Sequence, residues 1–343
     1  MARPTRLQII LVSGWDLLNI EKMSMPATMI QATRACPISG SKDAYEVCSK
    51  DRHGKPLRNI ISADCGLIYV DPVPFENTEE FYKTEYRKSY KGVHSPKPKH
   101  VYRAGKVAMG RVSRLSNYLP EGAQCLDAGS SSGEFVYLLE KRGFDAQGVE
   151  ANIPYAEYSQ AELGIEVSIS PFSEFRSEKN FDLITMFHVL EHLENPVRDL
   201  SYLGEFLKPG GKLVIEVPNI LYPDMAFSHK WHPGHLFSFS DKTLSLLLAK
   251  AGFKTISCGQ IDDGGNLWGV FEISEGVHSN ELRKIQASLG VKNLHELEKG
   301  KMDYKLNIKN YFKFIPKLLN QLVEKKFANA KSGKEILDQL YST

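Results

Sequence analysis

The stretch Cys125-Leu-Asp-Ala-Gly-Ser-Ser-Ser-Gly-Glu134 decides the fold of this chain. A short apolar strand runs directly into a turn of glycine and serine, and a helix follows the turn. Gly129 allows the backbone to approach a ligand closely, and Gly133 permits tight packing where the helix begins. About 20 residues later the next predicted strand ends in Glu150, which is placed to accept hydrogen bonds from the two hydroxyls of a ribose. The turn and the acid together indicate a cofactor that contains adenosine.

Strand and helix patterns alternate from residue 124 onward with short connections, which is typical of a doubly wound sheet. We expect strands at 124–128, 145–150, 166–170, 181–187, 212–217, 254–258 and 267–273. We expect helices at 133–142, 155–163, 196–207 and 241–251, with Gly210, Gly211 and Gly252 just past helix ends. The sequence therefore predicts an α/β fold with a Rossmann-like, mostly parallel sheet of seven strands and helices on both faces.

The rest of the chain divides around this unit. We expect a flexible start at 1–34, a small Cys-bearing segment at 35–75, a helical region at 76–120, the cofactor-binding domain at 121–275 and a helical C-terminal extension at 276–343. A helix is expected at 81–90, and the exposed loop predicted at 91–100 is a candidate lid. In the extension, Ile315, Leu318, Leu319 and Leu322 recur at helical spacing, which is typical of a packing face. Dimerisation and substrate capping are the alternatives.

Composition excludes several classes of protein. The 43 basic and 41 acidic residues give a net charge of only +2, which does not favour a nucleic-acid partner. The apolar stretch at 7–20 is interrupted by Asp16 and is too short to span a bilayer, so no membrane association is expected. No convincing signal-peptide cleavage site follows this apolar stretch. Five irregularly spaced cysteines make no disulfide framework. We therefore expect a cytoplasmic protein.

A dinucleotide cofactor is the first alternative to weigh. Dehydrogenase turns follow the pattern G-x-G-x-x-G, and in this turn only Gly129 fits. S-adenosylmethionine (SAM) has no pyrophosphate and carries a cationic sulfonium. A turn with fewer glycines, preceded by the carboxylate of Asp127, suits such a ligand better.

Four motifs occur in order along the chain: 126–133, Phe181-Asp-Leu-Ile184, Val189-Leu-Glu-His192 and Leu207-Lys-Pro-Gly-Gly-Lys-Leu213. Together they resemble the class I SAM-dependent methyltransferases. The resemblance is closest to the branch in which His-x-Leu-Glu-His follows the fourth strand and a later helix precedes Ala251-Gly252-Phe253. Ser131 departs from the family pattern, which more often has a second glycine at that position.

The resemblance implies a set of cofactor-binding residues. Asp127, Gly129, Ser131 and Gly133 would line the methionine end of SAM, and Glu150 would hold its ribose. Two more residues are implied on the same grounds. Phe172, beyond the third strand, would flank the adenine, with a place in the core as its alternative, and His188 would lie beside the methyl-bearing sulfur.

Histidines supply the candidate catalytic groups. The segment 188–192 also fits H-x-x-E-H, an inverted zinc-peptidase pattern, but that pattern requires both histidines on one helical face, whereas His188 ends a predicted strand. A second cluster, His229-Lys-Trp-His-Pro-Gly-His235, follows the fifth strand on the side where such sheets bind ligands. Histidine titrates near neutral pH and suits a general base, so His192 and His235 are the candidates. Hydrogen bonding to local backbone is the alternative role.

The cysteine segment resembles a degenerate zinc ribbon. Cys36-Pro-Ile-Ser-Gly40 and the later stretch around Cys65 each keep one cysteine of a C-x-x-C pair, and Ser39 and Ser62 stand at the missing positions. Cys48 and His53 are possible substitutes, yet two intact pairs are what make a zinc site. We expect a ribbon that is held by packing, and we predict no metal site.

The sequence thus predicts a SAM-dependent methyltransferase that acts on a small-molecule or glycan-type acceptor, at oxygen, with a homodimer as an option. Two other hypotheses stay open: a non-catalytic binding module with the SAM fold, and an NAD-dependent oxidoreductase.

Overall fold

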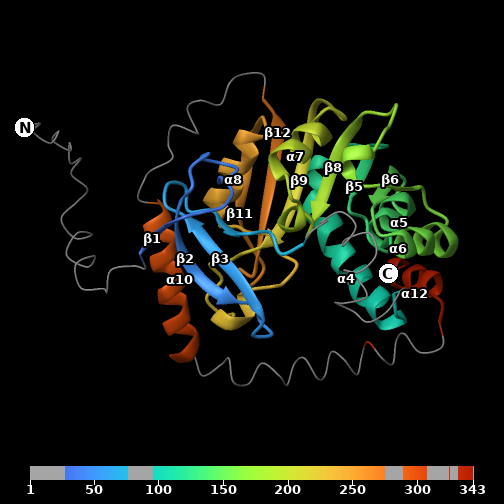
Figure 1. Ribbon diagram of the computed structural model, residues 1–343. Coiled ribbons are helices and arrows are strands. Elements are labelled where there is room, and N and C mark those ends of the chain that lie inside the picture. Colours follow the sequence, from blue (N-terminus) through green and yellow to red (C-terminus); the bar gives the residue numbers. More distant parts are fainter. Residues whose placement is uncertain (1–27, 76–95, 275–288, 307–323, 325–330, 343) are drawn as a thin grey trace, which may run out of the picture.

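The computed structural model describes residues 28–75, 96–274, 289–306, 324 and 331–342 (Figure 1). Its centre is a seven-stranded sheet with the order β11-β12-β9-β8-β5-β6-β7. Neighbouring strands pair in parallel from β7 to β9, while β12 is antiparallel to both β9 and β11. The Rossmann-like, mostly parallel sheet predicted from the sequence is confirmed.

The strands of this sheet are β5 (Gln124–Ala128), β6 (Asp145–Glu150), β7 (Val167–Ile169), β8 (Phe181–Phe187), β9 (Leu207–Pro218), β11 (Phe253–Ile261) and β12 (Asn266–Ile273). The helices are α4 (Pro98–Leu115), α5 (Glu134–Lys141), α6 (Ile153–Tyr158), α7 (Pro196–Gly204), α8 (Asp241–Lys250), α10 (Leu289–Leu306) and α12 (Gly333–Tyr341). Short helical turns are η2 (Ser116–Tyr118), η3 (Ser159–Leu163), η4 (Phe172–Glu174), η5 (Leu190–His192) and η6 (Phe227–Lys230). None of the described helices has the length and apolar character needed to cross a membrane.

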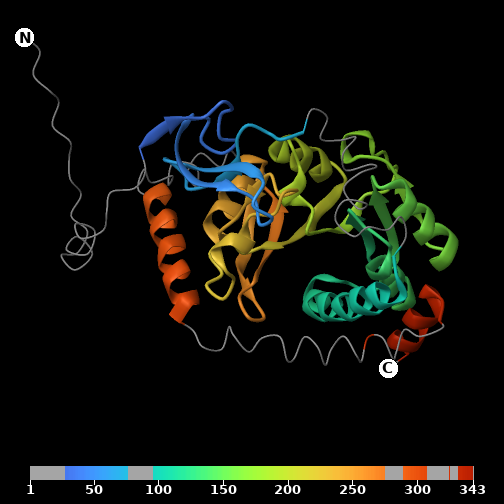
Figure 2. The same ribbon diagram turned by 60° about the horizontal axis from the view of Figure 1, so that its bottom comes forward.

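Helices cover both faces of the sheet because alternate strand residues point to opposite sides. Leu126 and Ile184 face a core that contains residues of α7 and α8. Cys125 and Leu183, one residue earlier on the same strands, face a second core formed with α4, α5 and α12. Figure 2 shows α4 lying across the sheet, with α12 beside it. The central strands β5 and β8 are therefore buried on both faces.

A second sheet joins the N-terminal segment to the central domain. Its strands are β1 (Met29–Gln31), β2 (Asp43–Lys50), β3 (Pro56–Ser62), β4 (Ile68–Val70) and β10 (Phe237–Ser238), paired in that order. The strand β10 follows the cluster 229–235 directly and pairs antiparallel with β4, so that Phe237 lies opposite Tyr69. The Cys-bearing segment thus anchors the loop that carries the second histidine cluster.

Several boundaries differ from the sequence-based expectation, most of all where α7 ends and β9 begins. Helix α7 ends at Gly204 rather than at residue 207, and β9 begins at Leu207, so Gly210 and Gly211 lie within β9 and not at a helix end. Gly210 has φ +78°, and the pairing of β8 with β9 shifts register between Phe181 and Leu183. The glycine pair therefore serves an irregular strand start, which local composition does not distinguish from a helix cap. Gly252, with φ +94°, does follow α8.

The region before the central sheet also departs from expectation. Pro98 opens α4, a helix of 18 residues, where the sequence suggested an exposed loop as far as residue 100. The missing N–H of a proline is tolerated in the first turn of a helix, which explains this start. The helix expected at 81–90 and the apolar stripe at 315–322 lie outside the described residues.

The C-terminal helices contact different parts of the molecule. Asn293 of α10 donates a hydrogen bond from Nδ2 to the carbonyl oxygen of Gly66 at 3.0 Å, beside the second sheet. Tyr341 of α12 donates from its hydroxyl to the carbonyl oxygen of Glu134 at 2.9 Å, at the start of α5. The described parts of the extension thus contact the second sheet through α10 and the helices α4 and α5 through α12.

Candidate functional site

A cavity of about 1310 Å³ opens at the carboxyl ends of β5, β6, β8 and β9. Residues of α4 and of the loop before β10 complete its wall, and Arg52 reaches it from the second sheet. Ligands of open α/β sheets bind at this edge of the strands. The volume exceeds that of an ordinary small-ligand pocket, so the cavity has room for two ligands side by side.

The turn between β5 and α5 has three residues with positive φ. Gly129, Ser131 and Gly133 have φ values of +84°, +54° and +82°. A Cβ added at Gly129 would lie 2.4 Å from Cγ2 of Val189, so the turn passes close to the segment after β8. Ser131 adopts a conformation that favours glycine, although it carries a side chain.

Glu150 ties this turn to the end of β6. Its Oε2 accepts a hydrogen bond from the backbone N–H of Ser131, and its Oε1 accepts one from Asn152, both at 2.8 Å. The side chain lines the cavity and is largely buried. Each carboxylate oxygen accepts more than one hydrogen bond, so the predicted ribose contact is compatible with these two.

Asp127 is buried at the end of β5. Its Oδ1 accepts a hydrogen bond from the hydroxyl of Thr185 on the neighbouring strand, at 2.7 Å. Burial raises the pKa of the Asp127 carboxyl to about 6, against the lowering effects of Thr185 and of the Arg111 charge. A cation bound beside Asp127 would favour the ionised carboxylate.

Phe172 lies in the turn η4 and lines the cavity. Its ring is partly buried and packs against the core beneath the sheet. Both roles proposed for it from the sequence, adenine contact and core, are compatible with this position.

His188 lies at the end of β8 between two carboxylates. Its Nε2 is 3.3 Å from Oε1 of Glu216, and its Nδ1 is 3.4 Å from Oε1 of Glu191. Burial disfavours the imidazolium, but the hydrogen bond with Glu216 and the negative charges of Glu191 and Glu216 outweigh it and raise the pKa of His188 to about 9. The residue also has φ +56°. At neutral pH His188 is therefore charged, and it is not a general base.

Glu216 and Arg111 form a charged pair on the same wall, which the sequence analysis missed. Arg111 donates from Nε to Oε2 of Glu216 at 2.8 Å, and its guanidinium lies 4.1 Å from the centre of the Phe187 ring. Burial would raise the pKa of Glu216, but His188 and Arg111 lower it to about 2. A signal was present, because Glu216 is the lone carboxylate in the apolar run at 213–217.

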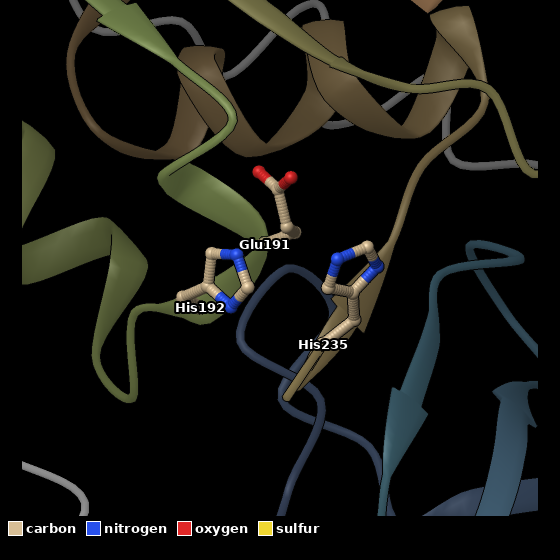
Figure 3. A group of neighbouring side chains, drawn as sticks. All are labelled: Glu191, His192 and His235. Atoms are coloured by element: carbon tan, nitrogen blue, oxygen red, sulfur yellow. The ribbon is translucent and has the colours of Figure 1, made fainter. Parts of the chain in front are cut away.

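The two predicted catalytic histidines lie together (Figure 3). Ring centres of His192 and His235 are 4.9 Å apart in an edge-to-face arrangement, and His235 stacks on His232 at 4.4 Å. His192 donates from Nδ1 to the carbonyl oxygen of Gly234 at 2.7 Å. Burial and the neighbouring charges hold the pKa of His235 well below its ordinary value. Both side chains line the cavity, while His229 of the same cluster is exposed.

Cys36 and Cys65 face each other in the second sheet, with their sulfur atoms 3.4 Å apart. Both are buried, and neither belongs to a set of three metal-ligating side chains among the residues that the structure describes. Cys48 instead donates to the carbonyl oxygen of Lys50 at the surface end of β2. A ribbon that is held by packing without a metal stays a prediction.

Comparison with known proteins identifies the central domain. The model of a family described as a methyltransferase domain matches residues 100–258, from α4 into β11. Among curated relatives, the mitochondrial ubiquinone biosynthesis O-methyltransferase of Dictyostelium discoideum is 27% identical over 132 residues, which are 33% of this chain and 41% of that protein. The ubiquinone biosynthesis O-methyltransferase of Rickettsia felis is 30% identical over 101 residues, which are 28% of this chain and 41% of that protein.

The chain thus spans less than half the length of these two relatives. Among solved structures, the magnesium protoporphyrin IX methyltransferase of Synechocystis aligns with a TM-score of 0.44 and 13% identity, covering 57% of this chain and 98% of that one. The matched region contains the turn after β5, Glu150 and the histidine motif after β8, in the order that the sequence predicted. Residues 100–258 therefore match a family of methyltransferase domains.

Proposed function

We propose that this protein transfers a methyl group from SAM to an oxygen atom of a small-molecule acceptor. One observation carries the proposal: a single cavity is lined on one side by the turn after β5 and Glu150, and on the other by Glu191, His192 and His235. The first set has the features of an adenosine site, and the second offers polar side chains to an acceptor.

Methyl transfer from SAM is an in-line displacement in which the enzyme mainly aligns the acceptor with the sulfonium. We infer that SAM lies along Gly129, Ser131 and Gly133, with the carboxylates of Asp127 and Glu150 at its charged and hydroxylated parts. The acceptor would then enter from the histidine side. The pair of Arg111 and Glu216 keeps His188 charged and in place between the two halves.

The choice of oxygen rests on the relatives, which are O-methyltransferases. A small molecule suits a cavity of this size better than a polymer does. A glycan-type acceptor, a homodimer and a cytoplasmic location stay predictions. Analytical ultracentrifugation of the full chain tests the homodimer, and a sedimentation coefficient of a monomer at all concentrations would contradict it.

Calorimetric titration of the full chain with SAM and with its demethylated product tests the cofactor. We expect both to bind with one site per chain, and NAD to give no heat. Absence of binding by both SAM and its product would contradict the proposal. NAD binding would favour the oxidoreductase.

Transfer itself is tested with SAM that carries a labelled methyl group and a panel of phenols, alcohols and sugar derivatives. Labelled product that depends on the enzyme excludes a non-catalytic module. Binding of SAM without transfer to any acceptor of a broad metabolite extract would favour that module.

A further inference from the structure

Three side chains at the acceptor end of the cavity have the composition of a metal site. One ligand atom each of Glu191, His192 and His235 can be chosen so that all three lie within 4.8 Å of one another. Figure 3 shows the carboxylate above the gap between the two rings, with one nitrogen of each ring turned toward that gap. Two imidazoles and one carboxylate are the ligand set of several catalytic sites for divalent metals.

Glu191 gives an independent indication of a missing ligand. Its side chain is only 1% exposed, yet neither carboxylate oxygen accepts a hydrogen bond from the residues that the structure describes. The nearest charge is Nδ1 of His188, 3.4 Å from Oε1. A buried carboxylate without hydrogen bonds is costly, and a bound cation on Oε2 would relieve that cost.

His192 is oriented as metal-binding histidines usually are. Its Nδ1 donates to the carbonyl oxygen of Gly234 at 2.7 Å, which places the proton on Nδ1 and leaves the lone pair on Nε2. A backbone carbonyl that accepts from the other ring nitrogen is a common partner of a metal-bound imidazole, because it fixes the tautomer and the ring orientation.

A backbone hydrogen bond joins the segment that carries Glu191 and His192 to the segment that carries His235. The N–H of Leu236 donates to the carbonyl oxygen of Glu191 at 2.7 Å, so the turn η5 and the residue after His235 are joined directly. Beyond Leu236 the chain enters β10, which pairs with β4. His232 supports the same loop, since its Nδ1 accepts from the N–H of Gly234 at 2.9 Å and its ring stacks on His235. The three ligands are thus arranged before any ion arrives.

We infer that Glu191, His192 and His235 bind a divalent first-row transition metal ion such as Zn²⁺ or Fe²⁺. Mg²⁺ and Ca²⁺ prefer oxygen ligands and are not expected to bind tightly to two imidazoles. Three protein ligands leave a coordination position open to the cavity, whose wall contains all three residues.

The role of the ion rests on the proposed function. An acceptor hydroxyl bound to the ion would lose its proton to water more readily, because the cation stabilises the oxyanion. The oxyanion then attacks the methyl carbon of SAM, a C–O bond forms, the C–S bond breaks, and its electron pair stays on sulfur. The products are the methyl ether and the neutral thioether. No histidine need act as base in this step.

Metal binding is tested first on the full chain, freed of metal with a chelator and titrated with Zn²⁺ and with Co²⁺. We expect one ion per chain by calorimetry, and visible absorption bands of Co²⁺ bound by nitrogen and oxygen. Glu191→Gln and His235→Asn should each weaken binding more than about tenfold. His229→Ala, an exposed histidine of the same loop, is the matched control and should bind as the unchanged protein does.

Cys36→Ser excludes the thiol pair as the source of the signal, because Co²⁺ on thiolate would give an intense charge-transfer band that this variant loses. Circular dichroism and melting of each metal-free variant show whether it is folded, and two different ligand variants guard against loss of fold in one. Binding that is equal in Glu191→Gln, His235→Asn and the unchanged protein would overturn the site, as would no binding of either metal.

The failure of the site and that of the proposed function are distinguishable. Stoichiometric metal that depends on Glu191 and His235 supports the site even if no acceptor is methylated. Full turnover by the metal-free enzyme, unaffected by added Zn²⁺ or Fe²⁺, would overturn the catalytic role of the ion while the methyltransferase proposal stands.

Discussion

Glu150 accepts two backbone hydrogen bonds in the structure, and the proposed ribose contact would be added to these. We predict that Glu150→Ala weakens SAM binding by tenfold or more, because charge-assisted hydrogen bonds contribute roughly 1.5 to 3 kcal/mol each. Calorimetric titration measures the loss. The melting temperature is the control, because the substitution also removes the carboxylate that accepts hydrogen bonds from the backbone N–H groups of Ser131 and Asn152. Unchanged affinity in a folded variant would remove Glu150 from the cofactor site.

The buried carboxyl of Asp127 predicts a pH dependence of stability. Its pKa is raised from 3.8 to about 6 in the folded protein, so between these pH values the folded chain keeps a proton that the unfolded chain has lost. Stability from this group therefore falls as pH rises through that window, by about 3 kcal/mol at most. Denaturant unfolding of the unchanged protein and of Asp127→Asn, at pH 4.5 and pH 7, measures the difference.

Asn at this position still accepts the hydrogen bond from Thr185, so the variant isolates the charge. Relative to the unchanged protein, Asp127→Asn should be more stable at pH 7 than at pH 4.5. An equal difference at both pH values would mean that the carboxyl titrates normally.

His235 lies at the acceptor end of the cavity, away from the turn after β5. His235→Ala should lower turnover about 10²- to 10⁴-fold while SAM affinity stays nearly unchanged, because a group that acts on the acceptor contributes in the transition state. Steady-state kinetics and SAM titration on the same sample measure both. The control is His229→Ala, and equal turnover in the two variants would exclude His235 from the reaction.

Among the elements, the turn between β5 and α5 offers a matched comparison of two glycines. Gly129 and Gly143 both have φ +84°, but a Cβ would meet Val189 at 2.4 Å in the first case and nothing within 4 Å in the second. Gly143→Ala should cost about 1 to 2 kcal/mol of strain. Gly129→Ala should cost more and should also weaken SAM binding. Equal losses of stability with unchanged SAM affinity would contradict the close approach at Gly129.

The elements also show what the sequence could predict. Strands β5, β6 and β8 have the expected bounds, because turn residues flank each of them. The start of β9 was wrong, since Gly210 and Gly211 suit a helix cap and an irregular strand equally well. Strand β10 has only two residues, and its partner is far away in the sequence, so no local pattern indicates it.

Some residues of the candidate site could likewise be predicted from the sequence, and others could not. The residues of the cofactor turn and Glu150 follow from a contiguous motif. Arg111 and Glu216 form their ion pair between a helix and a strand that are 105 positions apart, and only the fold brings them together. His192 and His235 were chosen from two clusters, yet their common contact with Glu191 depends on the position of β10. Pairwise contacts of this kind are not present in one sequence read alone.

At the scale of the whole molecule, the second sheet supports the acceptor side of the cavity. Ile61 of β3 is fully buried in a small core with Trp231, the residue before His232. Ile61→Ala should destabilise the protein by about 2 to 5 kcal/mol and lower turnover per folded molecule, because the loop loses its support. Denaturant unfolding measures the loss of stability, and steady-state kinetics at low temperature measure the turnover per folded molecule.

Leu337 of α12 is equally buried but packs against the other face of the central sheet, so Leu337→Ala is the matched control. It should lower stability by a similar amount with little change in turnover. Equal turnover per folded molecule in both variants would show that the second sheet does not position the histidine loop.

The pairing of β4 with β10 also determines the order in which the molecule can be completed during synthesis. Tyr69 emerges from the ribosome about 170 residues before its partner Phe237, a delay of roughly 10 to 30 s at ordinary translation rates. Until then the nascent second sheet has an open edge along β4, the kind of edge that pairs with foreign strands. The N-terminal segment of this protein, although made first, is therefore completed late, and a chain truncated before Phe237 would carry a standing risk of aggregation.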